Sequence, residues 1–218
     1  MLLPNKLNPE LFEILTGLIL GDASIYRTKT NNTFIKFEYS YKHEDYAIHL
    51  HNKLKSLTYS ESPSVYFAKK GSIEEGKPFS SFFYTFSHNS LNFFWDLFMV
   101  NGKKTVKPNL VLKYLNEKGL AYWILDDGSY NKSKGYITLH TEGFTLDEVC
   151  LLCAELNQKF NLDTKPMEKK NYKNKNQPSY WIIYIPKASV KILSLLKGFC
   201  ETIQSVPSLA HKIPKNLT

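Results

Sequence analysis

Two aspartates stand at the ends of two similar apolar runs, one run in each half of the sequence. Asp22 ends the run 15–22 (LTGLILGD), and Asp127 lies near the end of the run 120–128 (LAYWILDDG). Either acid alone would be read as an ordinary turn residue after a helix, because aspartate is common at such junctions. Two apolar helices that each deliver one acid indicate instead two half-sites of a single site.

A lysine near a proline follows each acid at a closely matched separation along the chain. Lys104 precedes Pro108 in the first half, and Lys212 precedes Pro214 in the second half. Lysines are abundant in this chain, so a solvated charge in a linker or tail is the alternative for both. The repeated placement favours a role for the two lysines beside the acids.

Two neighbouring carboxylates accompanied by lysines suggest chemistry on a phosphodiester. Like charges at close range are costly unless a cation, a shared proton or a basic neighbour relieves them. Hard oxygen ligands without a supporting His/Cys cluster favour Mg²⁺ as that cation. Mg²⁺ in such a site polarises a phosphate and activates a water molecule, and a lysine stabilises the charge that develops on the phosphate.

The composition points to a polyanionic partner. The 218 residues have a hydrophobic content of 43%, typical of a globular fold, and a net charge of +8, which favours nucleic acid or an acidic membrane surface. Arg27 is the only arginine, so the chain can make very few bidentate contacts between arginine and guanine. Abundant lysine, asparagine, tyrosine, phenylalanine and isoleucine are what AT-rich codons produce, which hints at an organellar genome in a mitochondrion or chloroplast.

The three cysteines predict no disulfide framework. Cys150 and Cys153 form a C-x-x-C pair in an apolar helical stretch, but two further ligands at zinc spacing are missing, so we expect buried small residues rather than a metal site. The N-terminus carries Pro4 and Pro9 before any apolar run and does not resemble a signal peptide. No apolar segment approaches the roughly 20 residues that span a bilayer, and we expect a soluble, reduced protein.

Periodicity predicts the same order of elements in both halves: helix, two strands, helix, two strands, helix. Asn8 is a candidate N-cap of the first helix, Thr145 and Glu148 form a capping box, and the strands alternate apolar and polar residues. The predicted helices are 8–21, 44–57, 90–100, 119–126, 146–160 and 188–203, and the predicted strands are 23–30, 33–39, 64–69, 80–86, 129–130, 136–140, 164–169 and 180–185.

These patterns predict an α+β fold built by duplication, with αββαββα halves at 1–117 and 118–218 and a pseudo-two-fold axis between them. A linker at 101–118 connects the halves. Gly17 and Gly21 leave a smooth stripe on the first helix, against which another helix can approach closely.

The two runs and the two lysines resemble the motifs of single-chain LAGLIDADG homing endonucleases, over residues 11–216. That family implies paired motif helices at the centre and two saddle-shaped, four-stranded antiparallel sheets in the DNA major groove. It implies Mg²⁺ as cofactor, with Mn²⁺ as a substitute and Ca²⁺ supporting binding but not cleavage. The implied metal ligands are Asp22, Asp127 and the carbonyls of Gly21 and Asp126, and the implied basic residues at the scissile phosphates are Lys104 and Lys212.

Two features depart from the family motif. Leu20 and Leu125 replace its earlier acid, at a position that is not a metal ligand in the family. Tyr122 and Trp123 replace a Gly-Leu pair in the second run, so the helix packing cannot be symmetric. We expect the glycine stripe of the first helix to receive the bulk of these two aromatic side chains.

Basic residues on strand faces and loops are the candidate DNA contacts. In such interfaces phosphate contacts position the protein, and a minority of side chains read bases. The candidates in the first half are Arg27, Lys29, Lys36, Lys69, Lys70 and Lys77, and those in the second half are Lys132, Lys134, Lys165, Lys169, Lys170, Lys173 and Lys175.

These observations predict a monomeric, Mg²⁺-dependent, intron-encoded endonuclease that cuts both strands of double-stranded DNA at a long asymmetric site. One alternative is a maturase on the same scaffold that binds intron RNA, and another is a DNA-binding regulator without cleavage. The presence of both acids and both lysines favours the nuclease, since a binding module needs none of the four.

Overall fold

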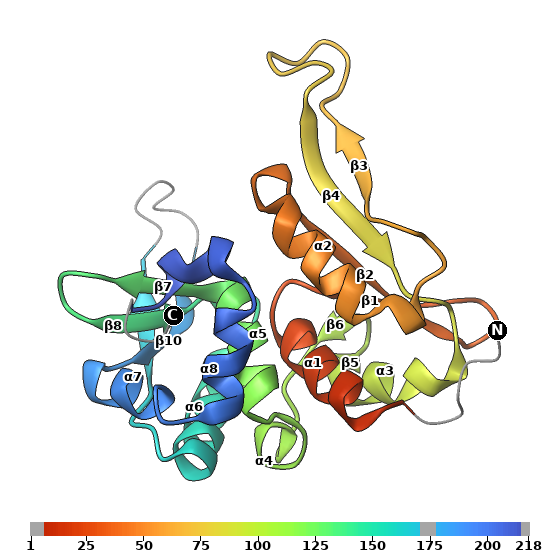
Figure 1. Ribbon diagram of the computed structural model, residues 1–218. Coiled ribbons are helices and arrows are strands. Elements are labelled where there is room, and N and C mark those ends of the chain that lie inside the picture. Colours follow the sequence, from red (N-terminus) through yellow and green to blue (C-terminus); the bar gives the residue numbers. More distant parts are fainter. Residues whose placement is uncertain (1–6, 171–177, 215–218) are drawn as a thin grey trace. The chain divides into compact units, whose positions relative to one another are not determined.

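The computed structural model describes residues 7–170 and 178–214 and contains helices and antiparallel sheets (Figure 1). The chain packs as two compact units. The first unit consists of residues 1–12 and 22–95, and the second unit consists of residues 13–21 and 96–218.

The boundary between the units differs from the predicted boundary after residue 117. The second unit takes most of the first helix, α1 (Pro9–Leu20), together with residues 96–117. Helix α1 belongs there because it packs against α5 (Glu117–Asp127), where glycines of the two helices meet. The predicted halves follow the repeat in the sequence, whereas the compact units follow these contacts.

The first unit is built on a four-stranded antiparallel sheet in the order β1-β2-β4-β3. Strict alternation along β2 (Thr33–Ser40) buries Ile35, Phe37 and Tyr39 on the face that α2 (Glu44–Lys53) covers. The intervening residues of β2 lie on the opposite, open face. The remaining elements are β1 (Ser24–Arg27), β3 (Ser64–Phe67), β4 (Pro78–Tyr84), the 3₁₀ helices Tyr41–His43, Lys55–Leu57 and Asn89–Leu91, and α3 (Asn92–Phe98), which continues into the second unit.

The second unit contains a matching antiparallel sheet in the order β7-β8-β10-β9, against which α6 (Leu146–Phe160) packs. Helix α5 lies beside α8 (Lys197–Gln204). Two four-stranded antiparallel sheets with packed helices confirm the predicted α+β fold. The remaining elements are β5 (Met99–Val100), β6 (Lys103–Lys104), α4 (Leu110–Tyr114), β7 (Gly128–Asn131), β8 (Tyr136–Leu139), β9 (Lys165–Lys169), β10 (Tyr180–Ile185), α7 (Lys187–Leu193) and the 3₁₀ helix η4 (Pro207–Lys212).

The predicted helix caps are confirmed. The Asn8 side chain accepts a hydrogen bond from the backbone N–H of Glu10 at 3.0 Å. At the start of α6, Thr145 accepts from the Glu148 backbone while the Glu148 carboxylate accepts from the Thr145 backbone. Each cap satisfies backbone donors that a helix start leaves without an intrahelical partner.

The single helix predicted at 188–203 is wrong, because the chain forms α7 and α8 with a break between them. The Ser194 hydroxyl donates to the carbonyl oxygen of Lys191 at 2.5 Å, and the Leu195 N–H donates to Ile192 at 2.9 Å. These short-range bonds replace the helical pattern and end α7, since a serine side chain competes for backbone groups.

The segment 101–118, predicted as a linker, is held firmly against α6. The carboxylate of Glu155, a buried residue of α6, accepts hydrogen bonds from the backbone N–H groups of Asn109, Val111 and Leu112. These donors lie at the start of α4, so a side chain from another helix caps α4. This attachment fixes the chain between β6 and α5.

Candidate functional site

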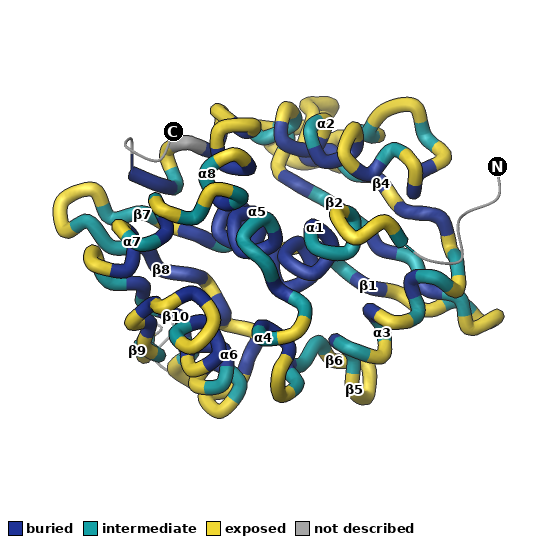
Figure 2. Tube along the Cα trace, turned by 60° about the horizontal axis from the view of Figure 1, so that its bottom comes forward, coloured by how far each residue is buried: buried dark blue, intermediate teal, exposed yellow. Residues whose placement is uncertain are grey.

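Helices α1 and α5 approach each other through glycine backbones; both lie in buried surroundings (Figure 2). A Cβ atom placed on Gly17 would lie 1.9 Å from the carbonyl oxygen of Gly119 and 2.6 Å from its carbonyl carbon. No side chain fits at that distance, so the two backbones are in direct contact. The close approach predicted from the glycine stripe is confirmed.

The residues that fill the stripe differ from the expectation. A Cβ atom on Gly21 would lie 2.7 Å from both Cβ and Oδ2 of Asp126, so Gly21 makes room for that acid. The atoms nearest to Gly17 and Gly21 come from Gly119 and Asp126, and not from Tyr122 or Trp123 as expected. Residues 119 and 126 are two turns apart on one stripe of α5, and it is this stripe that faces the glycines of α1.

One oxygen of Asp127 is held by an indole. Trp123 is fully buried, and its Nε1–H donates to Oδ2 of Asp127 at 3.2 Å. At Gly128 the chain leaves α5 for β7, and a Cβ there would lie 2.3 Å from the carbonyl oxygen of Ile124. Asp127 is half-buried at this helix end, and Asp126 is buried.

Asp22 directly follows Gly21 and is exposed. Asp22 begins the segment 22–95 of the first unit, whereas Gly21 ends the segment 13–21 of the second unit. The acid therefore lies next in the chain to the Gly21 carbonyl group.

A small hairpin places Lys104. Strands β5 and β6 pair through Met99 with Lys104 and are joined by Asn101 and Gly102, which have φ values of 50° and 77°. Positive φ at both positions is typical of a tight two-residue turn between paired strands. Lys104 Nζ donates to the carbonyl oxygen of Gly21 at 2.8 Å.

The 3₁₀ helix η4 places Lys212 in the equivalent way. Lys212 Nζ donates to the carbonyl oxygens of Leu125 and Asp126 at 2.6 Å and 2.5 Å. Each lysine ammonium thus contacts the carbonyl oxygen of the residue before a motif aspartate. The structure brings together the carbonyls of Gly21 and Asp126 and the ammonium groups of both lysines within the second unit.

The donors around this cluster are hard oxygens. Among the residues that the structure describes, no three histidines, cysteines, aspartates or glutamates form a group that could hold a metal ion. A cation here would rely on carboxylate and backbone carbonyl oxygens together. The ammonium groups of Lys104 and Lys212 lie against three carbonyl oxygens, those of Gly21, Leu125 and Asp126, so positive charge is favourable at these positions.

Sequence reasoning missed two features of this site. It treated Trp123 only as bulk, although the spacing of four residues from Asp127 places the two side chains one turn apart on a helix. It also continued a helix through residues 90–100, where α3 ends at Phe98 and the hairpin begins. The Asn101–Gly102 dipeptide is a hairpin signal that could have revealed the turn.

The candidate DNA contacts fall in different surroundings. Lys36 lies on the open face of the first sheet, but it pairs with Glu38 at 2.5 Å, and that carboxylate raises its pKa. Arg27 lies on the opposite face of β1, the same face as buried Ile25, and its guanidinium lies over the Trp95 ring. Lys29, Lys69, Lys70, Lys77, Lys132, Lys134 and Lys170 are exposed in turns and loops, Lys165 and Lys169 are on β9, and Lys173 and Lys175 lie outside the described residues.

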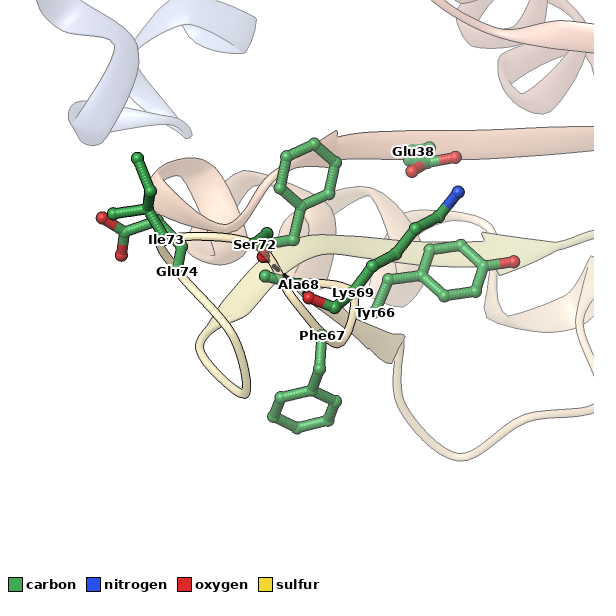
Figure 3. A pocket seen from close by; sticks show the side chains of 9 residues that line it. Glu38, Tyr66, Phe67, Ala68, Lys69, Ser72, Ile73 and Glu74 are labelled. Carbon is green, nitrogen blue, oxygen red and sulfur yellow. Dashed lines mark hydrogen bonds between the residues drawn. The ribbon is translucent and has the colours of Figure 1, made fainter.

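A hollow of about 630 Å³ in the first unit lies where β3 and β4 meet their connecting loop. Figure 3 shows the Lys69 side chain reaching toward Glu38, with the Phe67 ring pointing the opposite way. Ile73 in the loop is fully exposed. The lining carries one lysine and two carboxylates and offers no arrangement for catalysis.

The cysteine pair differs from the expectation in one member. Cys153 is buried, and burial raises the pKa of its thiol to about 11. Cys150, three positions before Cys153, lies on the solvent side of α6 and is exposed. The prediction that both cysteines are buried is therefore wrong for Cys150. Within the described ranges of the chain, no helix is both long and apolar enough to cross a membrane.

The duplicated fold, the glycine contact of the motif helices and the acid at the end of α5 define a LAGLIDADG protein. The chain belongs to the LAGLIDADG DNA endonuclease family, whose model matches residues 12–193.

Two proteins of similar sequence and one similar solved structure illustrate this family. A probable intron-encoded endonuclease 1 of Wickerhamomyces canadensis is 36% identical over 211 residues, which is 94% of this chain and 84% of that protein. A cytochrome b mRNA maturase bI2 of Debaryomyces hansenii is 34% identical over 161 residues, 72% of this chain and 59% of that protein. The solved structure of the homing endonuclease I-WcaI bound to its DNA recognition sequence has a TM-score of 0.80 at 31% identity and covers 96% of this chain and 88% of that chain.

Proposed function

We propose that this protein is an intron-encoded homing endonuclease that binds a long asymmetric DNA duplex and hydrolyses one phosphodiester in each strand. The observation that carries the proposal is the contact of each lysine ammonium with the carbonyl group before a motif aspartate, at 2.8 Å for Lys104 and 2.5 Å for Lys212. A module that only binds DNA has no use for two such pairs. The similarity to a homing endonuclease that was solved with its DNA site supports the choice of substrate.

The residues fit a hard divalent cation such as Mg²⁺. The carboxylates of Asp22 and Asp127 and the carbonyls of Gly21 and Asp126 are the oxygen donors that Mg²⁺ prefers, and both carbonyls already attract an ammonium group. When bound, the ion supplies activation of water and polarisation of the phosphate. We expect Mn²⁺ to replace Mg²⁺, and Ca²⁺ to support DNA binding without cleavage.

The chain's own residues have separate tasks in this proposal. Trp123 fixes the orientation of the Asp127 carboxylate through its hydrogen bond to one carboxylate oxygen. Lys104 and Lys212 balance the negative charge that grows on the phosphates during attack. One acid and one lysine serve each strand, so a monomer carries both half-sites.

Replacing each acid by its amide tests the site. Asp22→Asn and Asp127→Asn remove the charge and keep the shape, so we expect loss of double-strand cleavage with DNA affinity in Ca²⁺ nearly unchanged. The substrate is the duplex that the protein cleaves, selected from a random library, and Asp147→Asn, at an exposed position of α6, is the control. Normal cleavage by either motif variant would contradict the assignment.

A maturase function is the second candidate, because one similar protein is named as a cytochrome b mRNA maturase. Splicing of an intron RNA in the presence of the protein, together with no cleavage of any selected duplex, would favour it. The proposed source in both cases is an intron of an organellar genome.

A further inference from the structure

The open face of the first sheet is aromatic. Tyr26, Phe34, Tyr66, Phe82 and Tyr84 alternate with the residues that pack beneath α2, and we call these five side chains the aromatic face. Their rings contact one another across three strand boundaries. The ring centroids of Tyr26 and Phe34 are 5.2 Å apart, those of Phe34 and Tyr84 are 6.1 Å apart, those of Phe82 and Tyr84 are 5.7 Å apart, and those of Tyr66 and Phe82 are 3.9 Å apart.

The two charges on this face neutralise each other. Lys36 Nζ lies 2.5 Å from the Glu38 carboxylate, and Ser80 donates a further hydrogen bond to Glu38 at 2.7 Å. The ammonium group also lies 5.5 Å from the Tyr66 ring centre and 5.9 Å from that of Tyr84. Lys36 is therefore paired with its neighbours within the sheet, which leaves the aromatic face without a net charge and with the hydroxyls of its three tyrosines as its other polar groups.

Positive charge surrounds the aromatic face instead of crossing it. Lys29 is exposed in the turn between β1 and β2, and Lys69 and Lys70 are exposed in the loop between β3 and β4. Exposed lysines at the two ends suit phosphate groups, and an uncharged aromatic strip between them suits the floor of a groove. The open face of the second sheet also carries tyrosines, Tyr136, Tyr180 and Tyr184, but Lys169 and Lys165 lie directly opposite two of them on β9.

The apolar group on the floor of the DNA major groove is the C5-methyl of thymine, and phenylalanine is one of the side chains that contacts it. We infer that the aromatic face reads thymine methyl groups in one half of the target site. This inference rests on the proposed function, since it requires that the sheet lie against duplex DNA. The scarcity of arginine agrees with it, because guanine readout by bidentate contacts is nearly unavailable.

Stacking on unpaired bases, as in RNA-binding sheets, is the other use of an aromatic surface. It needs ring faces that are free to receive a base. Here Tyr66 and Phe82 lie almost parallel at 13°, and Tyr26 and Phe34 lie at 16°, so in both pairs one face of each ring is turned toward a neighbouring ring. With one face covered, these rings offer less surface for stacking on base planes, whereas a compact methyl group needs only a small contact area.

Removing only the methyl groups tests the inference. In the duplex that the protein cleaves, thymine is replaced by deoxyuridine in one half-site, then in the other, and the affinity is measured in Ca²⁺. We expect the larger loss in one half-site, of about fourfold per contacted methyl, from the transfer free energy of a group of that size. Equal affinity for all three duplexes, or the same loss in both half-sites, would overturn the inference, while continued cleavage of the thymine duplex would leave the proposed function standing.

Variants connect the effect to the sheet. Tyr26→Ser and Tyr84→Ser change residues that are 43% and 39% exposed, so we expect the fold to be retained and the preference for thymine over deoxyuridine to fall toward one. Tyr59→Ser, at a residue 85% exposed on the loop before β3, should keep the full preference. The same preference in all three variants would overturn the assignment to the aromatic face. Tight binding of single-stranded RNA that depends on Tyr26 and Tyr84, without a methyl effect, would replace it with base stacking.

Discussion

The indole of Trp123 controls one oxygen of Asp127, and its effect on cleavage is separable from its effect on DNA binding. Trp123→Phe keeps most of the buried volume and removes the N–H that donates at 3.2 Å. We expect cleavage to slow by about 10- to 100-fold, the usual effect of losing a group that orients a metal ligand, with DNA affinity in Ca²⁺ little changed. Trp181→Phe on β10 is the matched control. Equal cleavage rates for the two variants would mean that Trp123 contributes only packing and does not orient Asp127.

The two cysteines of α6 should differ sharply in reactivity. Burial raises the pKa of the Cys153 thiol to about 11, so at pH 8 it stays protonated and is shielded, whereas Cys150 is exposed. Because the thiolate is the reactive form, a thiol reagent should modify Cys150 rapidly and Cys153 only after unfolding. Cys150→Ser should remove the fast phase. Rapid labelling that persists in this variant, and that Cys153→Ser then abolishes, would contradict the burial of Cys153.

At the scale of elements, the contact between α1 and α5 depends on one glycine. Gly17→Ala would place a methyl group 1.9 Å from the Gly119 carbonyl oxygen, so the helices must separate. We expect a loss of at least about 2 kcal/mol in the free energy of unfolding, measured by denaturant titration. Gly143→Ala, where a Cβ meets nothing within 4 Å, should change stability by less than about 0.5 kcal/mol. A similar stability for both variants would rule out direct backbone contact.

Long periodic elements were predictable, and short or tertiary ones were not. The alternation of β2 and the capping box of α6 are local signals, so sequence reasoning located both elements. The strands β5 and β6 contain two residues each and are too short to show a period. The break between α7 and α8 involves the hydrogen bond from the Ser194 hydroxyl to the Lys191 carbonyl. A serine can make the same bond inside a continuous helix, so the residue type alone does not predict the break. The contact of Lys104 with the Gly21 carbonyl joins distant segments, so matched spacing could suggest the site but not this hydrogen bond.

At the scale of the whole molecule, the net charge of +8 predicts a DNA affinity that depends steeply on salt. The logarithm of the affinity should fall linearly with the logarithm of the salt concentration. Lys132→Ala, in the exposed turn between β7 and β8, should reduce the slope by about one if it contacts a phosphate. Lys36→Ala should leave the slope unchanged, because Glu38 already neutralises this lysine. The reverse result would mean that Lys36 leaves Glu38 to bind a phosphate.

Gly21 and Asp126 hold equivalent places in the two motifs, yet one has no side chain and the other has a carboxylate that fills the space the first leaves. Two copies of the first motif would face glycine with glycine and leave a void. Two copies of the second would press one Asp126 carboxylate against another, with the repulsion of like charges. The halves of this duplication are therefore no longer interchangeable, and a symmetric dimer built from either half would need this position redesigned before its helices could pair.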